Sequence, residues 1–174
     1  MAVFILGLFD YMVTNVRGGT LTLKDSGTIT NGGAINANYA TLLLDYTGLT
    51  APASRTGAST INLAGGTLTF NAKQGNESFS IAGAINATNG ANTITAPLIF
   101  GGNGSQLIRN NSSGGPTGPL TITGNITKSD SGDLQFSAGS GISVSGNINV
   151  NGKVVSLANS VVLSGTNSAG SWDL

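Results

Sequence analysis

The sequence predicts an all-β fold, a parallel β-solenoid of about seven to eight coils. Three observations support this prediction. First, apolar residues alternate with small polar residues in short runs, which places the apolar side chains of each run on one face of a strand. Second, pairs such as Gly-Gly, Asn-Gly and Ser-Gly separate the runs, and Gly and Asn favour tight bends because they tolerate positive φ. Third, two motifs recur at separations that resemble multiples of one coil.

The composition excludes several classes of protein. The chain has 174 residues, seven Lys plus Arg and seven Asp plus Glu, so its formal net charge is zero. A nucleic-acid footprint would need clustered Lys and Arg, and we expect no nucleic-acid partner. The chain has no His and no Cys, which removes Ser-His-Asp and Cys-His catalysis, His- or Cys-based metal sites and disulfides.

The first residues form a segment of their own. Residues 1–9 are an apolar run without a basic stretch before it, and the run is shorter than the ~20 apolar residues that span a bilayer. We expect residues 1–17 to be an N-terminal strand or cap, with a degenerate signal segment as the alternative, and we expect no membrane insertion. Residues 18–174 are expected to be solenoid repeats, a segment of a longer protein.

Alternating runs predict short strands along the rest of the chain. In each run, two apolar residues two positions apart would face the interior, and the Thr, Ser or Asn between them would face outward. These apolar pairs are Leu21/Leu23, Ile61/Leu63, Leu68/Phe70, Phe79/Ile81, Leu120/Ile122, Leu134/Phe136, Ile142/Val144 and Ile148/Val150.

Repeated motifs set the length of a coil. The hexapeptide GGTLTL at residues 18–23 returns as GGTLTF at residues 65–70, 47 residues later. A second motif, apolar-x-apolar-x-Gly-x-Ile-Asn/Thr, occupies residues 79–86, 120–127 and 142–149, with a looser copy at 29–36. Its central glycines Gly33, Gly83, Gly124 and Gly146 lie 50, 41 and 22 residues apart. We interpret these gaps as two, two and one coils of about 20–25 residues, with loops inserted at corners.

Part of the chain resembles known bacterial repeats. Residues 124–139 (GNITKSDSGDLQFSAG) are similar to the autotransporter-associated β-strand repeat, although two aspartates stand where that repeat usually has Gly and Thr. Residues 92–99 and the two hexapeptides GGTLTL and GGTLTF are similar to the same family, and residues 132–157 resemble filamentous-haemagglutinin-type repeats. The residues that fall on the first pattern are Lys128, Gly132, Leu134 and Phe136.

The resemblance implies a right-handed parallel β-helix in a passenger-type protein, exported and displayed on the bacterial cell surface or released outside the cell. The expected function is a non-catalytic structural stalk or adhesin body without a cofactor. Its partners would be a host or environmental surface, a glycan or a matrix. Three alternatives stay open: an extracellular filament subunit that self-associates through open coil ends, an ice- or glycan-binding solenoid face, and a polysaccharide-processing β-helix enzyme.

We predict no catalytic, cofactor-binding or metal-binding residues, and we interpret the acidic residues as turn formers. Asp130 and Asp133 lie close to Lys128, and paired carboxylates can act as acid and base in glycoside cleavage. A polar turn, with the aspartates bonded to backbone amides, is the favoured interpretation. The remaining acids beside predicted turns are isolated: Asp25, Asp45 and Glu77.

The glycine-rich stretch at residues 101–106 is predicted to be a turn. It has the glycines of a calcium-binding solenoid loop but Gln106 where such a loop needs Asp. Because Ca²⁺ takes several oxygen ligands, charged ones among them, we expect no calcium there.

Thr-x-Thr pairs are the most specific surface feature. On several ice-binding solenoids, flat arrays of outward Thr-x-Thr order surface water, and this requires the pairs to align coil after coil. Later copies are separated by 47, 26 and 28 residues, which leaves that alignment in doubt. The alternative is an ordinary outward ladder, because Thr favours strands. The pairs are Thr20/Thr22, Thr28/Thr30, Thr67/Thr69, Thr93/Thr95 and Thr121/Thr123.

Two further positions are candidates for binding. Arg109 adjoins the longest irregular stretch, residues 110–119, and a loop on a rigid rod is where binding residues usually lie. A plain loop is the alternative for this stretch. Trp172 is expected to pack against a following coil rather than to bind a sugar.

Overall fold

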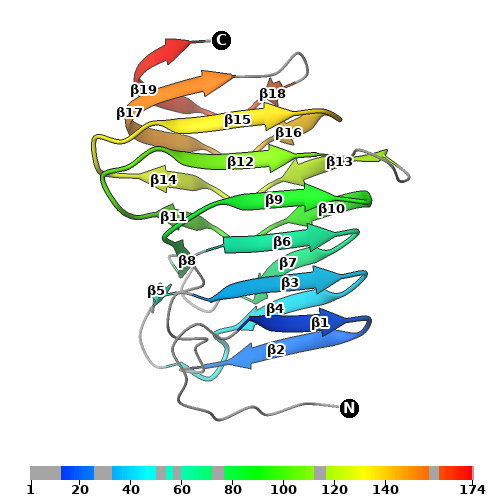
Figure 1. Ribbon diagram of the computed structural model, residues 1–174. Coiled ribbons are helices and arrows are strands. Elements are labelled where there is room, and N and C mark those ends of the chain that lie inside the picture. The colour runs from blue at the N-terminus through cyan, green and yellow to red at the C-terminus, as the bar shows by residue number, and fades with distance from the viewer. Residues whose placement is uncertain are drawn as a thin grey trace.

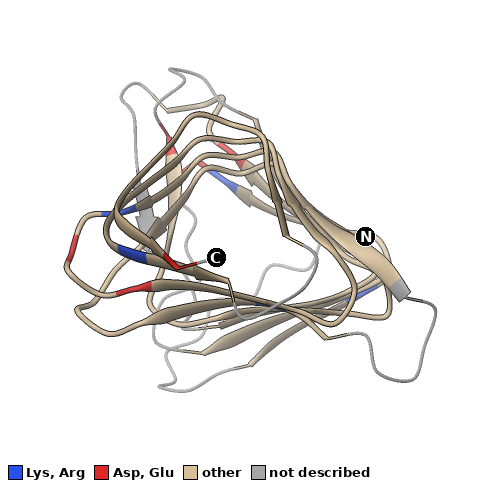
Figure 2. Ribbon diagram, turned by 90° about the horizontal axis from the view of Figure 1, so that it is seen from above, with Lys and Arg blue, Asp and Glu red and all other residues tan. Residues whose placement is uncertain are grey.

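In the computed structural model, the chain is an all-β parallel solenoid of about six turns. The structure describes residues 13–25, 33–49, 54–56, 60–71, 77–111, 117–156 and 161–173, and no helix lies among them. Figure 1 shows the coils stacked along one axis, and Figure 2, seen along that axis, shows a triangular outline. The predicted fold class is confirmed. The coils are slightly fewer than seven to eight, because equivalent residues of successive coils lie up to 28 positions apart.

Seven strands form one side of the triangle, which we call side 2. They are β2 (Thr20–Lys24), β4 (Thr41–Asp45), β7 (Thr67–Asn71), β10 (Gly90–Ile94), β13 (Thr117–Ile122), β16 (Ile142–Val144) and β18 (Val161–Leu163).

The other two sides form a single twelve-stranded sheet, because β17 (Ile148–Ser156) runs around the corner between them. Side 1 holds the second half of β17 and β1 (Thr14–Arg17), β3 (Ala34–Asn38), β6 (Thr60–Ala64), β9 (Ile85–Thr88), β12 (Gln106–Asn110) and β15 (Leu134–Ala138). Side 3 holds the first half of β17 and β5 (Ser54–Thr56), β8 (Ser78–Ile81), β11 (Leu98–Phe100) and β14 (Ile126–Lys128). The last strand, β19 (Asn167–Asp173), pairs with both halves of β17.

From β3 onward, each coil passes through side 1, side 2 and side 3 in that order, and every pair among the described strands is parallel. Thr20 pairs with Thr41, and Thr41 pairs with Thr67. The 47 residues that separate the hexapeptides at residues 18–23 and 65–70 therefore span two coils. The two-residue bend between alternating runs is also confirmed, because two residues join β1 to β2, β3 to β4 and β6 to β7.

The second motif occurs at two different corners. Gly83 lies between β8 and β9, where side 3 turns into side 1, whereas Gly124 lies between β13 and β14, where side 2 turns into side 3. The interpretation of their 41-residue separation as two coils is therefore wrong. The physical reason is that both corners join alternating strands through a glycine-containing bend, so the local sequence does not tell which corner it makes.

Close approach of consecutive coils requires glycine at the corner between sides 2 and 3. A Cβ atom on Gly124 would lie 2.1 Å from the carbonyl oxygen of Ala96, and one on Gly146 would lie 2.1 Å from that of Gly124. The same holds for Gly165, whose Cβ would lie 2.3 Å from the Gly146 oxygen. Successive coils can keep the usual strand spacing of about 4.8 Å at this corner only where the side chain is absent.

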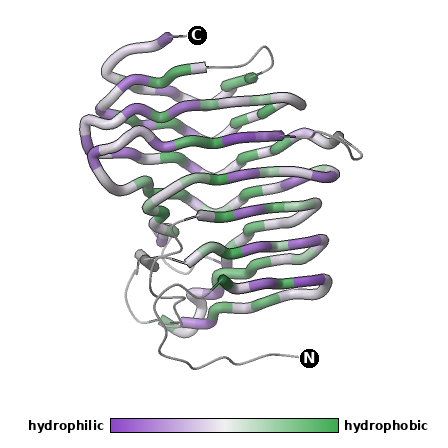
Figure 3. The backbone as a smooth tube through the Cα atoms, viewed as in Figure 1, coloured by the Kyte–Doolittle hydropathy of each residue, from purple (hydrophilic) through white to green (hydrophobic). Residues whose placement is uncertain are grey.

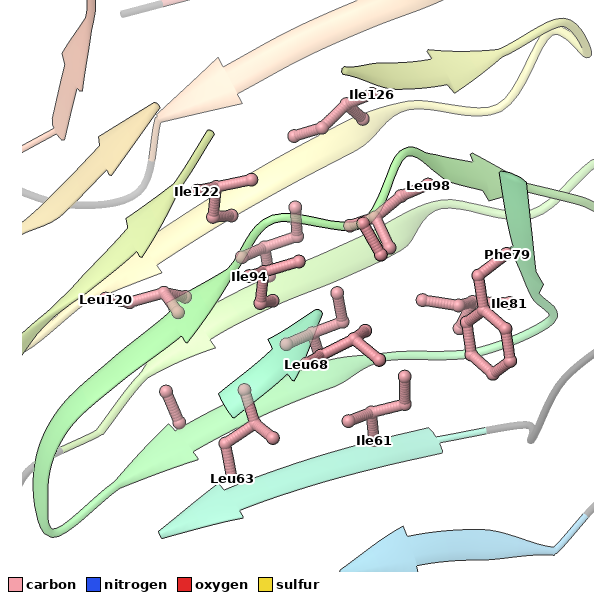
Figure 4. Close-up of a cluster of buried hydrophobic side chains, with 14 of the residues drawn as sticks. Ile61, Leu63, Leu68, Phe79, Ile81, Ile94, Leu98, Leu120, Ile122 and Ile126 are labelled. Carbon is pink, nitrogen blue, oxygen red and sulfur yellow. The ribbon is translucent and has the colours of Figure 1, made fainter. Parts of the chain in front are cut away.

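The interior is filled by the apolar members of the alternating runs. Along the described strands hydrophobic and hydrophilic residues alternate (Figure 3). The buried hydrophobic residues pair with one another in successive strands and therefore stack in columns. One column is Leu68, Ile94 and Ile122, which pair in successive strands and are fully buried. Figure 4 shows these residues facing Phe79 and Leu98 from side 3. Burial of these columns holds the three sides together, because the hydrophobic effect scales with the apolar area removed from water.

The corner between sides 1 and 2 uses left-handed backbone. Gly18, Gly65 and Asn89 occupy it with φ of 67°, 63° and 48°. Tyr39 takes the same conformation, with φ of 48°, although it is neither Gly nor Asn. Its ring covers the next coil, because a Cβ on Gly65 would lie 2.7 Å from the Tyr39 ring.

The irregular stretch predicted at residues 110–119 is shorter in the structure. β12 extends to Asn110, and β13 begins at Thr117, so Pro119 lies within a strand. A register irregularity opposite, between Gly90 and Asn92 of β10, lets the ladder accommodate this segment, since proline is confined to edges and bulges of sheets. Residues 112–116 lie outside the described residues, as do residues 1–12; the described part of the N-terminal segment, β1, pairs with β3.

Candidate functional site

The outward surface of side 2 carries the Thr-x-Thr pairs, and the structure brings them into register. Thr93 pairs with Thr67 below and with Thr121 above. Thr95 and Thr123 each lie one residue beyond the end of their strand, and backbone hydrogen bonds keep them in the same register. The amide of Thr95 donates to Leu68 O at 2.8 Å, and that of Thr123 donates to Ile94 O at 2.9 Å. Unequal coil lengths therefore do not disturb the alignment. The pair Thr28/Thr30 lies outside the described residues.

We call this surface the threonine face and define it by two outward columns. Every described position in them is Thr or Ser except Leu43 and Val162. The first column is Thr20, Thr41, Thr67, Thr93, Thr121, Ser143 and Val162, and the second is Thr22, Leu43, Thr69, Thr95, Thr123, Ser145 and Ser164.

Two neighbouring hydroxyls on the threonine face bond to each other. Thr95 Oγ1 donates to Thr69 Oγ1 of the coil below at 2.7 Å. All the residues of both columns are half-buried or exposed, and none carries a charge. Each Thr of the threonine face therefore presents a hydroxyl and a methyl group. The orientation of both groups is restricted, because branching at Cβ limits χ1.

Side 1 carries an asparagine ladder whose members the sequence analysis did not identify, although it placed Asn on the outward faces. The side-chain amide of Asn36 donates to Asn15, that of Asn62 donates to Asn36, and that of Asn86 donates to Asn62, over 2.7–2.9 Å. The ladder residues are 21, 26 and 24 positions apart. A recurring Ile-Asn dipeptide at residues 35–36, 61–62 and 85–86 is the signal that could have revealed it.

Two further asparagines point inward at the corner of sides 1 and 2. Asn92 Oδ1 accepts from the amide of Gly66 at 2.9 Å. The side-chain amide of Asn110 donates to the carbonyl oxygens of Gly118 and Gly141, at 3.1 and 2.8 Å. Both side chains are buried and replace backbone partners that the bend leaves unsatisfied.

Asp130 and Lys128 form an ion pair where side 3 meets side 1. Lys128 is fully buried, and its Nζ donates to Asp130 and to the carbonyl oxygen of Gly102, the latter at 2.8 Å. Asp130 also accepts from the amide of Gly132 at 3.1 Å. The hydrogen bond from Lys128 lowers the pKa of Asp130 below its usual range; burial opposes this shift, and the Gly132 amide reinforces it.

The other predicted turn acids also contact the main chain. Asp133 accepts from the amide of Lys153 in the next coil at 3.2 Å, and Asp25 accepts from the amide of Gly48 at 2.8 Å. Asp45 accepts from the amide of Thr47 two residues later at 3.1 Å. The interpretation as turn formers is confirmed for Asp130 and Asp45, whose amide partners lie two residues later. Asp133 and Asp25 bond instead to backbone amides of the adjacent coil. Glu77, by contrast, is buried directly before β8.

The remaining candidates take ordinary places in the fold. Residues 101–105 form an exposed turn between β11 and β12, and Gln106 donates to Gly101 O at 3.2 Å. Arg109 lies on β12, between Asn86 and Ser137 of the adjacent coils. Trp172 continues the column of Val154, and 38% of it is exposed.

No family model, curated protein or solved structure matches this chain. Within the described ranges, no helix could cross a membrane, and no group of three acidic residues is placed to hold a metal ion. Function therefore has to be inferred from the surfaces of the solenoid.

Proposed function

We propose that this chain is a non-catalytic structural segment: the stalk or adhesin body of a passenger-type protein on the bacterial surface or outside the cell. The observation that supports it is the unbroken parallel ladder of side 2, from β2 through β4, β7, β10, β13 and β16 to β18. Every coil bonds to the coils before and after it, so the chain forms a stiff rod. At about 4.8 Å per coil, about six turns give a length of about 30 Å.

The charged residues support the same role. Lys128 and Asp133 each reach a backbone group of a neighbouring coil, namely Gly102 O and the amide of Lys153. Asp25 does so as well through the amide of Gly48. These three charged side chains, which in an enzyme could act on a substrate, form hydrogen bonds between adjacent coils.

The compartment follows from the resemblance of residues 124–139 to passenger repeats. Such a rod would carry contacts with a host or environmental surface, a glycan or a matrix. We test the compartment by antibody labelling of intact and permeabilised cells that produce the full protein. Labelling of intact cells is expected; labelling that requires permeabilisation would contradict surface display.

The structural role is tested against catalysis with a panel of polysaccharides. We expect no cleavage by the wild-type chain. If the wild-type chain cleaves a polysaccharide and folded Asp130→Asn and Asp133→Asn variants do not, the structural role is refuted and the protein is an enzyme. Circular dichroism of both variants provides the folding control.

A further inference from the structure

The threonine face is a two-dimensional lattice. Strand spacing fixes the repeat along the axis at about 4.8 Å, and two residues along a strand span about 6.6 Å. The single register irregularity next to this lattice, between Gly90 and Asn92, precedes both columns. Hydroxyl and methyl groups therefore recur at constant intervals from β2 to β13, with Leu43 as the one interruption.

The fold alone does not require this regularity. The other two sides have the same parallel strands, but their outward columns contain few Thr, and the column of side 1 begins with the asparagine ladder. On side 1 the column of Asn86 continues with Arg109 and Ser137. On side 3 the outward column reads Ser80, Ile99, Thr127, Asn149 and Ser168. A general preference of strands for Thr would act on all three sides equally, so the concentration of Thr on side 2 needs a reason specific to that side.

The chemistry of the lattice identifies its ligand. A soluble small molecule is held in a concave pocket with a few convergent polar groups, whereas the threonine face repeats one group across a sheet. The two columns contain no charged residue, which an ionic surface would need, and no aromatic ring, on which sugars commonly stack. A neutral, periodic surface of ordered water matches the threonine face. The hydroxyls can form hydrogen bonds with that water, and the methyl groups lie between the hydroxyls.

We propose that the threonine face binds ice. Thr67, Thr93 and Thr121 form the centre of the first column, and Thr69, Thr95 and Thr123 form that of the second. The bond between Thr95 and Thr69 leaves the hydroxyl pair fixed, so few degrees of freedom are lost when the face meets a crystal. Ice binding is a function separate from the structural role, because the solenoid can serve as a stalk whether or not one of its sides binds a ligand.

The experiment measures ice recrystallisation and thermal hysteresis with the purified 174-residue chain. The wild-type chain should stop recrystallisation and shape ice crystals. Thr93→Lys should lose this activity, because it places a long charged side chain in the centre of the lattice. Thr93→Val, which keeps the methyl group, should lose less.

Thr127→Lys is the matched control: it makes the same change at an outward position of side 3. It should retain the full activity. The proposal is overturned if the wild-type chain has no effect on ice, or if folded Thr127→Lys loses as much activity as Thr93→Lys. Should Thr93→Lys fail to fold, as judged by circular dichroism, Thr93→Val against Thr127→Val gives the same comparison.

Discussion

Replacement of Gly146 by Ala tests how closely the coils stack. The new Cβ would lie 2.1 Å from the Gly124 carbonyl oxygen, about 1.3 Å closer than ordinary van der Waals contact allows. Because both atoms belong to the main chain or are fixed to it, no side-chain rotation can relieve the overlap. The two coils must separate at this corner.

Separation would break the backbone bonds that flank the corner. Ser145 donates its amide to Ile122 O at 2.9 Å, and Ile126 donates to Asn147 O at 2.8 Å. A loss of about 1–1.5 kcal/mol for each bond, with some strain in the surrounding strands, gives a destabilisation of about 3 kcal/mol. For a chain of this size, the melting temperature should fall by about 6–12 °C.

Urea unfolding followed by circular dichroism provides the measurement, and Gly101→Ala provides the control. A Cβ on Gly101 meets nothing within 4 Å, so this variant should stay within about 0.5 kcal/mol of the wild type. Equal unfolding midpoints for the Gly146→Ala and Gly101→Ala variants would refute the close stacking of consecutive coils at this corner.

Three further predictions concern the core, the asparagine ladder and the ion pair. Phe136→Ala should lower the free energy of unfolding by about 3–5 kcal/mol, because its side chain is fully buried; a loss below about 1 kcal/mol in urea titration would contradict the packing of this column. Asn62→Ala removes a bond on each side and should lower stability by about 1–2 kcal/mol, whereas a neutral effect would mean that the ladder contributes nothing. Because the folded state lowers the pKa of Asp130, its ionised form stabilises the fold above about pH 4. That contribution is lost as pH falls through the lowered pKa. Unfolding midpoints measured from neutral to acidic pH should therefore depend less on pH in Asp130→Asn, and an unchanged profile would show that the pair with Lys128 is not linked to folding.

Local sequence predicted the strands well because the inward or outward direction of a side chain is a local property. Leu68 and Phe79 face the interior for the same reason: they alternate with polar neighbours along an extended chain. The turn role of Asp130 was also readable, since an Asp bonds to the backbone two residues later. The sequence places Asn110 at the start of a loop, whereas the structure buries it at the end of β12. Sequence neighbours could not reveal this burial, because it depends on the carbonyl groups of Gly118 and Gly141.

By itself, the sequence determined that this protein is a parallel solenoid with an apolar interior and polar faces, because alternation and bends act within a few residues. Only the tertiary structure decided which corner Gly83 and Gly124 occupy, and that Thr67, Thr93 and Thr121 stand in one column. Alignment between coils depends on the total number of residues around each turn, corner loops included. Those loops absorb the unequal spacings, so the threonine face and the asparagine ladder form only when the coils stack.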